Sequence, residues 1–338
     1  MATRAQVASL AGVSETTVSY VITGNKPISE PTRLRVLAAM ETLQYRPNIM
    51  AQGLAGGKSK ILAMLFASEN RDISNGAYEY VLAAASTARA LGYHLLLLPT
   101  EDRDVQEVIE LSKAGLVDGV ILMEVRLEDE RVTALRTASI PTGLMGRTTS
   151  DDASNYADRD FETDVSVAVE YLHSLGHTNI ALFTGTDTAA DHQLGWLEWT
   201  DSAFKNALIK FGIAGTIIHR ATTIEAGRKL GEEFVTNFPD VTGLVCMNND
   251  GTLGFVHQYV SMGYEIPKDL SVISLSFPDI LISSTTPQLT SISPPSEAIG
   301  SSAVTFLIDE LLGLDHKEQR RLWNGQLVIR ESTSKPSR

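Results

Sequence analysis

The chain has 338 residues, a formal net charge of −13 and a single cysteine, Cys246. This length allows more than one domain, and no apolar run is long enough to span a membrane. One cysteine excludes a disulfide framework within the chain, and residues 1–4 lack the apolar segment of a secretory signal. We therefore expect a cytoplasmic protein without a membrane partner.

The charge is unevenly distributed along the chain. Residues 1–60 hold seven Lys/Arg and three Asp/Glu, a net of +4, so the remainder holds 21 basic and 38 acidic residues, a net of −17. A basic head on an acidic body suits a protein whose head meets phosphates and whose body does not. An accidental asymmetry of this size is the alternative.

The first part of the chain, residues 5–57, predicts three small helices with a helix-turn-helix at the front. Val7, Leu10 and Ala11 recur at helical spacing, Gly12 suits a left-handed helix end, and Ser14 is a good N-cap for the next helix. Val18, Val21 and Ile22 then form a buried face. A short helix with a polar outer face fits the DNA major groove, and a small helical cap without a ligand is the alternative.

A third helix is expected over residues 29–43, with Val36, Leu37, Met40 and Leu43 facing a small core. Arg33 and Arg35 lie away from that core and are candidates for phosphate contacts or for surface salt bridges. Residues 48–55 predict a two-turn helix that Gly53 weakens by roughly 1 kcal/mol relative to alanine. Such a short helix is marginal alone, so it should be ordered only with DNA.

Several of these residues also carry a family resemblance. They are Val7, Ala8, Ala11, Gly12, Val13, Ser14, Thr17, Val18, Ser19, Val21, Ile22 and Gly24, then Thr32, Arg33, Arg35, Val36 and Ala39, then Tyr45, Arg46, Pro47 and Asn48. With this spacing, the first sixty or so residues resemble, without a gap, the headpiece of the lactose-repressor (LacI/GalR) family of bacterial transcription regulators. Weaker matches continue to about Gly313.

The resemblance implies a set of DNA-binding residues. They are Thr3, Ser14, Glu15, Thr16, Thr17, Ser19, Tyr20, Asn25, Lys26, Ala51 and Leu54. Glu15, Thr16 and Tyr20 fall at base-reading positions, and the recognition helix has no Lys or Arg. Leu54 matches the leucine of the family's hinge helix, which wedges into the central base step of the minor groove. Simple packing of Leu54 within a linker is the alternative.

From residue 60 onwards strands alternate with helices, in two series. This pattern predicts an α/β fold with two parallel, doubly wound sheets that have helices on both faces. It matches the two-lobed, periplasmic-binding-protein-like core of the same family. The expected domains are a helix-turn-helix headpiece (1–47), a hinge helix and linker (48–58), an N-terminal core lobe (59–158 and 290–318) and a C-terminal core lobe (159–289 and 319–338). The extended segment 288–293 should cross back to the first lobe, and 322–329 should supply the last strand of the second.

Ligands in such folds bind at the carboxyl ends of the strands, between the lobes. The family pattern implies an effector site lined by Asn75, Tyr78, Glu124, Arg126, Arg147, Asp160, Phe161, His192, Trp196, Asn248 and Ser276. Each of these taken singly can equally be a surface or structural residue. Two depart from the family: His192 stands where an arginine is usual, and Ser276 stands where an aspartate is common. Either the ligand is then not a simple monosaccharide, or the pocket has degenerated and no longer binds a sugar.

We weigh three functions. The first is a homodimeric repressor that binds a palindromic double-stranded operator in the nucleoid and responds to a small effector, most simply a carbohydrate. The second is a cytoplasmic sugar-binding module without DNA regulation. The third, an enzyme, is disfavoured because the sequence has no phosphate loop, no His-Glu-x-x-His and no Cys/His metal spacing. We expect no catalytic residue, no metal and no cofactor. The sequence does not give the sign of ligand control, so the effector can be an inducer or a corepressor.

Overall fold

The computed structural model describes residues 2–23, 26–45, 58–67, 77–100, 104–149, 155–185, 193–277, 282, 285–314 and 319–337. Contacts divide the chain into two compact units, 1–61 with 110–118 and 62–109 with 119–338. Among the described residues, no helix is both long and apolar enough to cross a membrane. No group of three or more His, Cys, Asp or Glu side chains in the same residues could hold a metal ion.

The headpiece has the three predicted helices, α1 (Arg4–Ala11), α2 (Glu15–Thr23) and α3 (Glu30–Thr42). Their core is small and is built from the buried side chains of Val7, Ala8, Ala11, Val18, Val36 and Ala39. The prediction that Leu37 faces this core is wrong, since it is 41% exposed, and Leu10 on α1 is also 54% exposed. Helices α1 and α3 instead turn alanines inward beside a valine, and α2 contributes Val18, because small side chains let three short helices approach closely.

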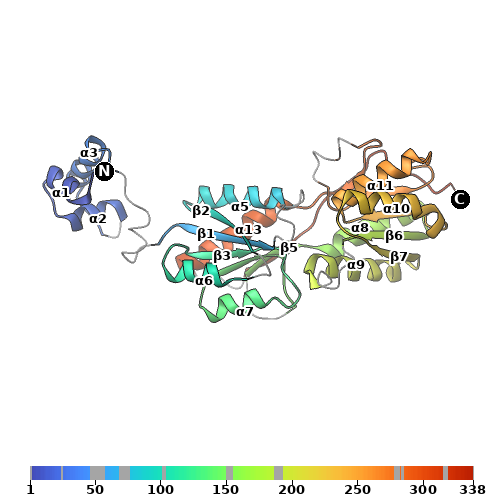
Figure 1. Ribbon diagram of the computed structural model, residues 1–338, viewed down its shortest axis with the longest axis horizontal. Helices are drawn as coiled ribbons and strands as arrows, with labels where there is room; N and C mark the ends of the chain where they lie inside the picture. The colour runs from blue at the N-terminus through green and yellow to red at the C-terminus, as the bar shows by residue number, and fades with distance from the viewer. Residues whose placement is uncertain are drawn as a thin grey trace. The chain divides into compact units, whose positions relative to one another are not determined.

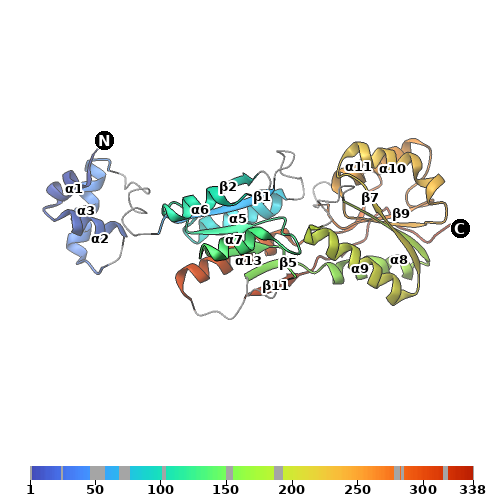
Figure 2. The ribbon, with the colours of Figure 1, turned by 60° about the horizontal axis from the view of Figure 1, so that its bottom comes forward.

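The first sheet of the core has six strands in the order β11-β5-β4-β3-β1-β2. Their bounds are β1 Ile61–Ala67, β2 His94–Thr100, β3 Gly119–Leu122, β4 Thr142–Met145, β5 Asn155–Arg159 and β11 Arg320–Trp323. Helices α5 (Tyr78–Ala90) and α13 (Ser296–Leu312) lie together on one face, while α6 (Gln106–Lys113) and α7 (Glu130–Thr137) lie on the other (Figures 1 and 2). The buried run at 62–65 is apolar throughout because both faces of the strand are covered.

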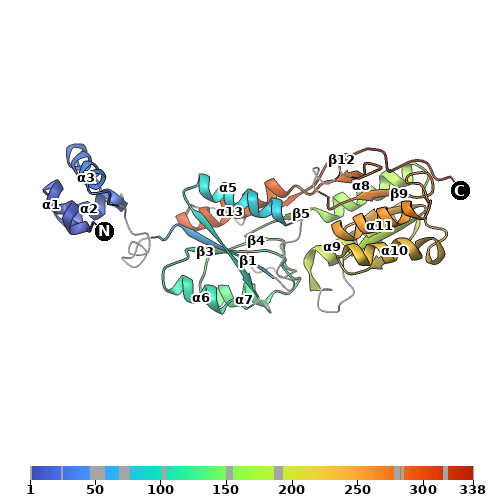
Figure 3. The same ribbon diagram turned by 45° about the horizontal axis from the view of Figure 1, so that its top comes forward.

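The second sheet also has six strands, in the order β12-β10-β9-β8-β6-β7. Their bounds are β6 Asn179–Thr184, β7 Ala214–His219, β8 Gly243–Cys246, β9 Ser271–Ser274, β10 Thr290–Ile292 and β12 Leu327–Val328. Helices α10 (Ile224–Asn237) and α11 (Asn249–Ser261) pack side by side on one face (Figure 3). Helices α8 (Phe161–Ser174) and α9 (Gly195–Phe211) pack together on the other face. The predicted class, two parallel sheets with helices on both faces, is confirmed, apart from the short edge strand β12, which pairs antiparallel with β10.

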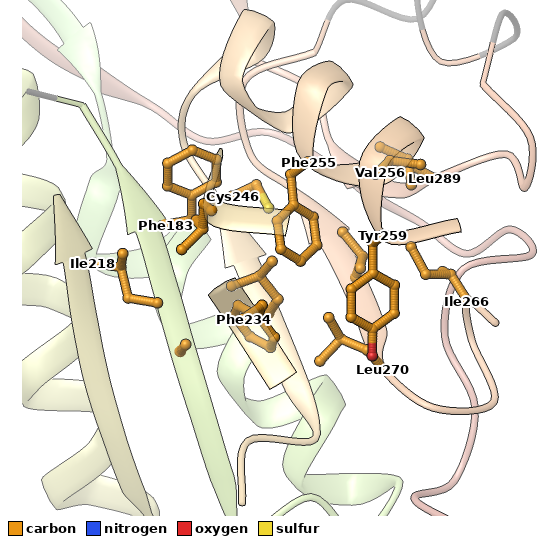
Figure 4. Close-up of a cluster of buried hydrophobic side chains, with 14 of the residues drawn as sticks. Phe183, Ile218, Phe234, Cys246, Phe255, Val256, Tyr259, Ile266, Leu270 and Leu289 are labelled. Atoms are coloured by element: carbon orange, nitrogen blue, oxygen red, sulfur yellow. The ribbon is translucent and has the colours of Figure 1, made fainter. Parts of the chain in front are cut away.

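Strand β6 shows how the sequence supplies two cores at once. Ala181 and Phe183 join the cluster under α10 and α11, and Ile180 and Leu182 join the cluster under α8 and α9. Figure 4 shows the first cluster, in which the ring centroids of Phe234 and Phe255 are 5.1 Å apart in an edge-on arrangement. Side chains alternate between the faces of a strand, so a continuous apolar run becomes two buried layers.

Two strands lie in different sheets from those expected. The segment 288–293 forms β10, which pairs with β9 in the second sheet, and only α13 after it crosses back. The expected strand over 322–329 is split, because β11 pairs with β5 in the first sheet and β12 pairs with β10 in the second. Gly325 lies between them and allows the chain to change sheets, since a Cβ there would lie 2.4 Å from the carbonyl oxygen of Ser293.

His177 is a buried group that fastens the C-terminal segment to the second sheet. Its Nε2 lies 3.0 Å from the carbonyl oxygen of Ser334 and 3.1 Å from Ser271 Oγ, and its Nδ1 lies 2.8 Å from Thr242 Oγ1. A carbonyl only accepts, so Nε2 carries the hydrogen and Nδ1 accepts from the threonine hydroxyl. Burial lowers the pKa of His177, which keeps the folded imidazole neutral.

The protein should therefore lose thermal stability in mild acid. The pKa of His177 is lower in the folded state than its ordinary value of 6.5, so its contribution is present above that value and is lost as the pH falls through the folded-state pKa. We expect H177Q to have a lower Tm than the wild type at pH 7.5. Between pH 7.5 and pH 5.5, the Tm of H177Q should fall by less than the Tm of the wild type. Calorimetry at the two pH values checks this, and an equal gap in Tm at both would contradict it.

Candidate functional site

The turn that presents the second headpiece helix is defined by backbone geometry and caps. Gly12 has a φ of +66°, a left-handed conformation that other residues rarely adopt. Ser14 Oγ then accepts a hydrogen bond of 3.1 Å from the backbone N–H of Thr17 and lies 2.9 Å from Thr17 Oγ1. Ser14 and Thr17, both predicted DNA contacts, therefore also fix the start of α2.

The polar face of α2 carries the remaining predicted contacts. Glu15 and Thr16 are exposed, and Ser19 and Tyr20 are half-buried. Arg4 Nε lies 3.3 Å from Glu15 Oε2, so the acidic group expected to oppose phosphate has a cation beside it. Likewise, Lys26 Nζ lies 5.1 Å from the centroid of the Tyr20 ring.

Thr3 is the exposed N-cap of α1 and shares a capping box with Gln6. Arg33, one of the two arginines left open on the third helix, lies 3.3 Å from Glu30, an exposed pair of the i,i+3 type. Five predicted site residues lie outside the described residues: Asn25, Ala51, Leu54, Asn75 and His192.

The structure brings most of the other predicted effector residues to the carboxyl ends of strands in both sheets. Arg126 follows β3, Arg147 follows β4, Asn248 follows β8 and Ser276 follows β9. Backbone pairing joins the two edges, since Arg126 forms an antiparallel bridge with Leu194 at the start of α9. This is the edge at which ligands of open α/β sheets bind.

Arg147 makes the most contacts among the predicted residues. Its Nη1 donates to Asp158 Oδ2 at 2.7 Å and to the carbonyl oxygen of Arg159 at 3.0 Å, and its guanidinium lies 4.4 Å from the centroid of the Trp199 ring. Burial raises the pKa of Asp158 to about 6, against the opposing effect of the Arg147 charge. Arg147 therefore joins the first sheet to α9.

Asp160 and Asn248 act as helix caps. Asp160 accepts from the backbone N–H of Thr163 at 3.0 Å, at the start of α8. Asn248 is 2% exposed, accepts from Gly251 N at 2.9 Å and donates to the carbonyl oxygen of Ala221 at 3.3 Å. Both amide atoms of Asn248 are thus occupied within the protein, so its effector role remains only a prediction.

The other predicted effector residues differ in their surroundings. Phe161 is 4% exposed and its ring lies 5.8 Å from the Arg159 guanidinium, whereas Tyr78 is 61% exposed on α5. Glu124 has a φ of +51°, in the left-handed region. Trp196 packs on Gly185 at the end of β6, where a Cβ would lie 2.3 Å from the indole.

A further feature of this edge is a set of buried polar atoms without a hydrogen-bond partner among the described residues. They are Thr184 Oγ1, Asn249 Oδ1, Ser276 Oγ, Trp199 Nε1 and Arg126 Nε. The first three follow or end the adjacent strands β6, β8 and β9. Buried polar groups are nearly always paired, so such a group of them at a strand edge indicates a site for a polar ligand or water.

Sequence reasoning missed Thr184, Asp158, Arg159 and Trp199. The charged residues at 158–160, directly before a helix, could have indicated a site, because consecutive charges rarely end a strand that is buried on both faces. Nothing in the sequence alone distinguished Thr184 from the other threonines.

Comparison with known proteins gives matches to both parts of the chain. The model for bacterial regulatory proteins of the lacI family matches residues 5–48, and that for a periplasmic binding protein-like domain matches residues 169–333. The HTH-type transcriptional regulator AglR of Rhizobium meliloti (strain 1021) is 28% identical over 338 residues, which covers 97% of this chain and 93% of AglR.

Solved structures match over nearly the whole length. The lac repressor dimer bound to operator and the anti-inducer ONPF is similar with a TM-score of 0.83 and 25% identity, covering 98% of this chain and 99% of that one. A complex of the transcriptional regulator CelR with cellobiose shares the fold, with a TM-score of 0.72 and 23% identity over 98% of this chain and 100% of that one.

The hydroxyl of Thr184 has no hydrogen-bond partner among the described residues, so it should lower the stability of the protein without ligand. Thr184 and Thr200 are both fully buried, but Thr200 Oγ1 donates to the carbonyl oxygen of Trp196 at 2.6 Å. We expect T184V to raise Tm, because valine has the same shape without the unsatisfied group, and T200V to lower it, each by the equivalent of about 1 kcal/mol. Calorimetry without ligand measures both, and a loss of Tm in T184V would show that its hydroxyl is satisfied.

Proposed function

The chain belongs to the lacI family of bacterial regulatory proteins and is a DNA-binding transcriptional regulator, and from this we propose that it is a homodimeric repressor controlled by a carbohydrate or carbohydrate derivative. Its operator is a palindromic double-stranded site, and it acts in the cytoplasm, on nucleoid DNA. The observation that carries ligand control is the group of buried polar atoms at the carboxyl edge of the second sheet that have no hydrogen-bond partner in the described part of the chain.

The chemistry of that group suits a polyhydroxylated ligand. Trp199 Nε1 and Arg126 Nε can only donate, Asn249 Oδ1 can only accept, and the hydroxyls of Thr184 and Ser276 can do either. Sugar hydroxyls both donate and accept, so a single saccharide can satisfy all three kinds of group. Aromatic side chains at the same edge, Trp196 among them, offer flat faces to its apolar side.

The first lobe offers a surface for the second copy. Tyr78, Leu82 and Leu91 on or next to α5 are 61%, 52% and 45% exposed, and Leu96 and Leu97 on β2 are 39% and 38% exposed. Large apolar side chains grouped on neighbouring elements favour burial by a partner. A two-fold dimer presents two headpieces, which explains the expectation of a palindrome.

Control then follows from a two-state core. A ligand that binds one angle of the two lobes more tightly than the other shifts their populations. In the dimer this shift brings together or separates the segments at 48–55, which lie outside the described residues. The family resemblance implies that these segments form helices that read the minor groove as a pair. Coupling of this kind typically amounts to ~1–3 kcal/mol, and either an inducer or a corepressor satisfies it.

The proposed DNA binding is tested by selecting binding sites from random duplexes with the full-length protein. We expect a palindromic site whose affinity falls steeply with salt through counterion release. Y20A should then weaken binding by about tenfold, the loss typical of one base contact. Fluorescence anisotropy measures the Kd.

T42A is the matched control, since Thr42 is an exposed residue near the end of α3. Its Kd for the selected site should equal that of the wild type. Selection that yields no preferred palindrome would overturn the proposed operator. If Y20A and T42A weaken DNA binding equally, α2 is not the helix that reads the bases.

The proposed ligand binding is tested by calorimetric titration of the purified protein with a saccharide library. We expect at least one saccharide to bind and to change the Kd for the selected DNA. S276A should weaken its binding by about fivefold, because one hydrogen bond to a buried hydroxyl is worth about 1 kcal/mol. If no saccharide binds while another class of metabolite does, the carbohydrate assignment is wrong.

A further inference from the structure

The two lobes are joined by three chain connections that contact one another. One leads from β5 to α8 at Asp160, one from β10 to α13 through 293–295, and one from β11 to β12 through 324–326. Asp160 N donates to the carbonyl oxygen of Trp323 at 2.8 Å, and Gly325 lies so close to Ser293 that a side chain would not fit. Any change in the angle between the lobes must act at this crossing.

Arg159 occupies this crossing and is 2% exposed. Its Nε donates to Asp164 Oδ2 at 2.6 Å, its Nη2 donates to the carbonyl oxygen of Ile292 at 3.0 Å, and its Nη1 donates to the carbonyl oxygen of Leu275. Arg159 ends a strand of the first sheet, whereas Leu275 and Ile292 follow or end strands of the second. One guanidinium thus spans both lobes.

Asp164 extends the same arrangement to the third connection. It is 1% exposed, and its Oδ1 accepts from the backbone N–H of Gly325 at 2.9 Å. The Arg159–Asp164 pair therefore touches all three connections. Both groups are buried, so each depends mainly on charged and polar protein groups, the partner first among them, for compensation of its charge.

This arrangement favours one angle over others. A guanidinium holds its donors in a rigid planar fork, so it can serve carboxylate and carbonyl acceptors only when these keep fixed relative positions. Rotation of one lobe about the connections would draw Leu275 and Ile292 away from Arg159 and leave a buried charge partly unsatisfied. The penalty for such a group is at least comparable with the free-energy differences that typically separate allosteric states, so it is large enough to shift the balance between lobe angles.

We propose that Arg159 is a positioning residue that sets the angle between the two lobes through its hydrogen bonds to Asp164, Leu275 and Ile292. By setting this angle, Arg159 also sets the concentration of ligand needed to change DNA affinity, without contacting ligand or DNA. This second step rests on the proposed function.

The chain contains a matched control in a second buried arginine. Arg131 donates to Asp129 Oδ1 and Oδ2 and to the carbonyl oxygens of Met123 and Glu124, at 2.8–3.1 Å. Like Arg159 it serves one aspartate and two carbonyls, but all of its partners belong to the first lobe. Loss of this pair should cost stability and leave the lobe angle unchanged.

The experiment measures a lobe-to-lobe distance in the full chain by pulsed electron resonance. Spin labels are attached to R136C on α7 and K229C on α10, both exposed positions. Cys246 is fully buried, and burial raises the pKa of its thiol to about 12, so it should escape labelling. R159M/D164N removes both charges and keeps an acceptor for Gly325, and R131M/D129N is its control.

We expect the distance in R159M/D164N to shift or broaden by more than about 2 Å, while R131M/D129N keeps the wild-type distribution. A wild-type distribution in R159M/D164N, with a loss of Tm like that of the control, would reduce Arg159 to a stability residue and overturn the proposal. If the double variant does not fold, R159K is judged by the same criterion, because its ammonium cannot reach all three acceptors.

This measurement needs neither DNA nor ligand, so its failure is distinct from failure of the proposed function. Once an operator and a saccharide are identified, R159M/D164N should also change the saccharide concentration at half-release or half-binding of DNA. An unchanged midpoint alongside a changed distance would break the proposed link between lobe angle and DNA affinity.

Discussion

The buried pair of Arg159 and Asp164 is the interaction on which the arrangement of the core depends. Each lobe is complete by itself, with a parallel sheet covered on both faces and its own apolar clusters. The hydrophobic effect is non-directional, so it stabilises each lobe without choosing an angle between them. Directional hydrogen bonds from one guanidinium to acceptors of both lobes can choose one.

The carboxyl edges around this pair combine rigid and unsatisfied groups. Arg147, Asp160 and Asn248 are held by Asp158, Thr163 and Gly251, so they give the edge a fixed shape. Thr184, Asn249 and Ser276 present polar atoms without partners among the described residues. A preformed frame with a few open polar groups is the usual composition of a small-ligand site, because a rigid site loses less entropy on binding.

The headpiece follows a different physical logic. Its core is too small for large side chains, and alanines at 8, 11 and 39 allow the close approach that three short helices need. Its charges act locally: Arg4 lies beside Glu15, and Lys26 lies over Tyr20. The absence of Lys and Arg from α2 therefore does not leave its face acidic, and cations from flanking positions supply the missing charge.

The sequence by itself determined the three headpiece helices, the turn at Gly12 and Ser14, the alternation of strands with helices and the two-sheet class, because these depend on local periodicity and on backbone preference. The tertiary structure decided which sheet receives β10 and β11, since short strands carry no mark of their neighbours. It also decided the roles of polar residues. Asn248 donates to Ala221, Thr184 has no hydrogen-bond partner within the described ranges, and Arg159 joins two lobes, because each role depends on atoms far away in the chain.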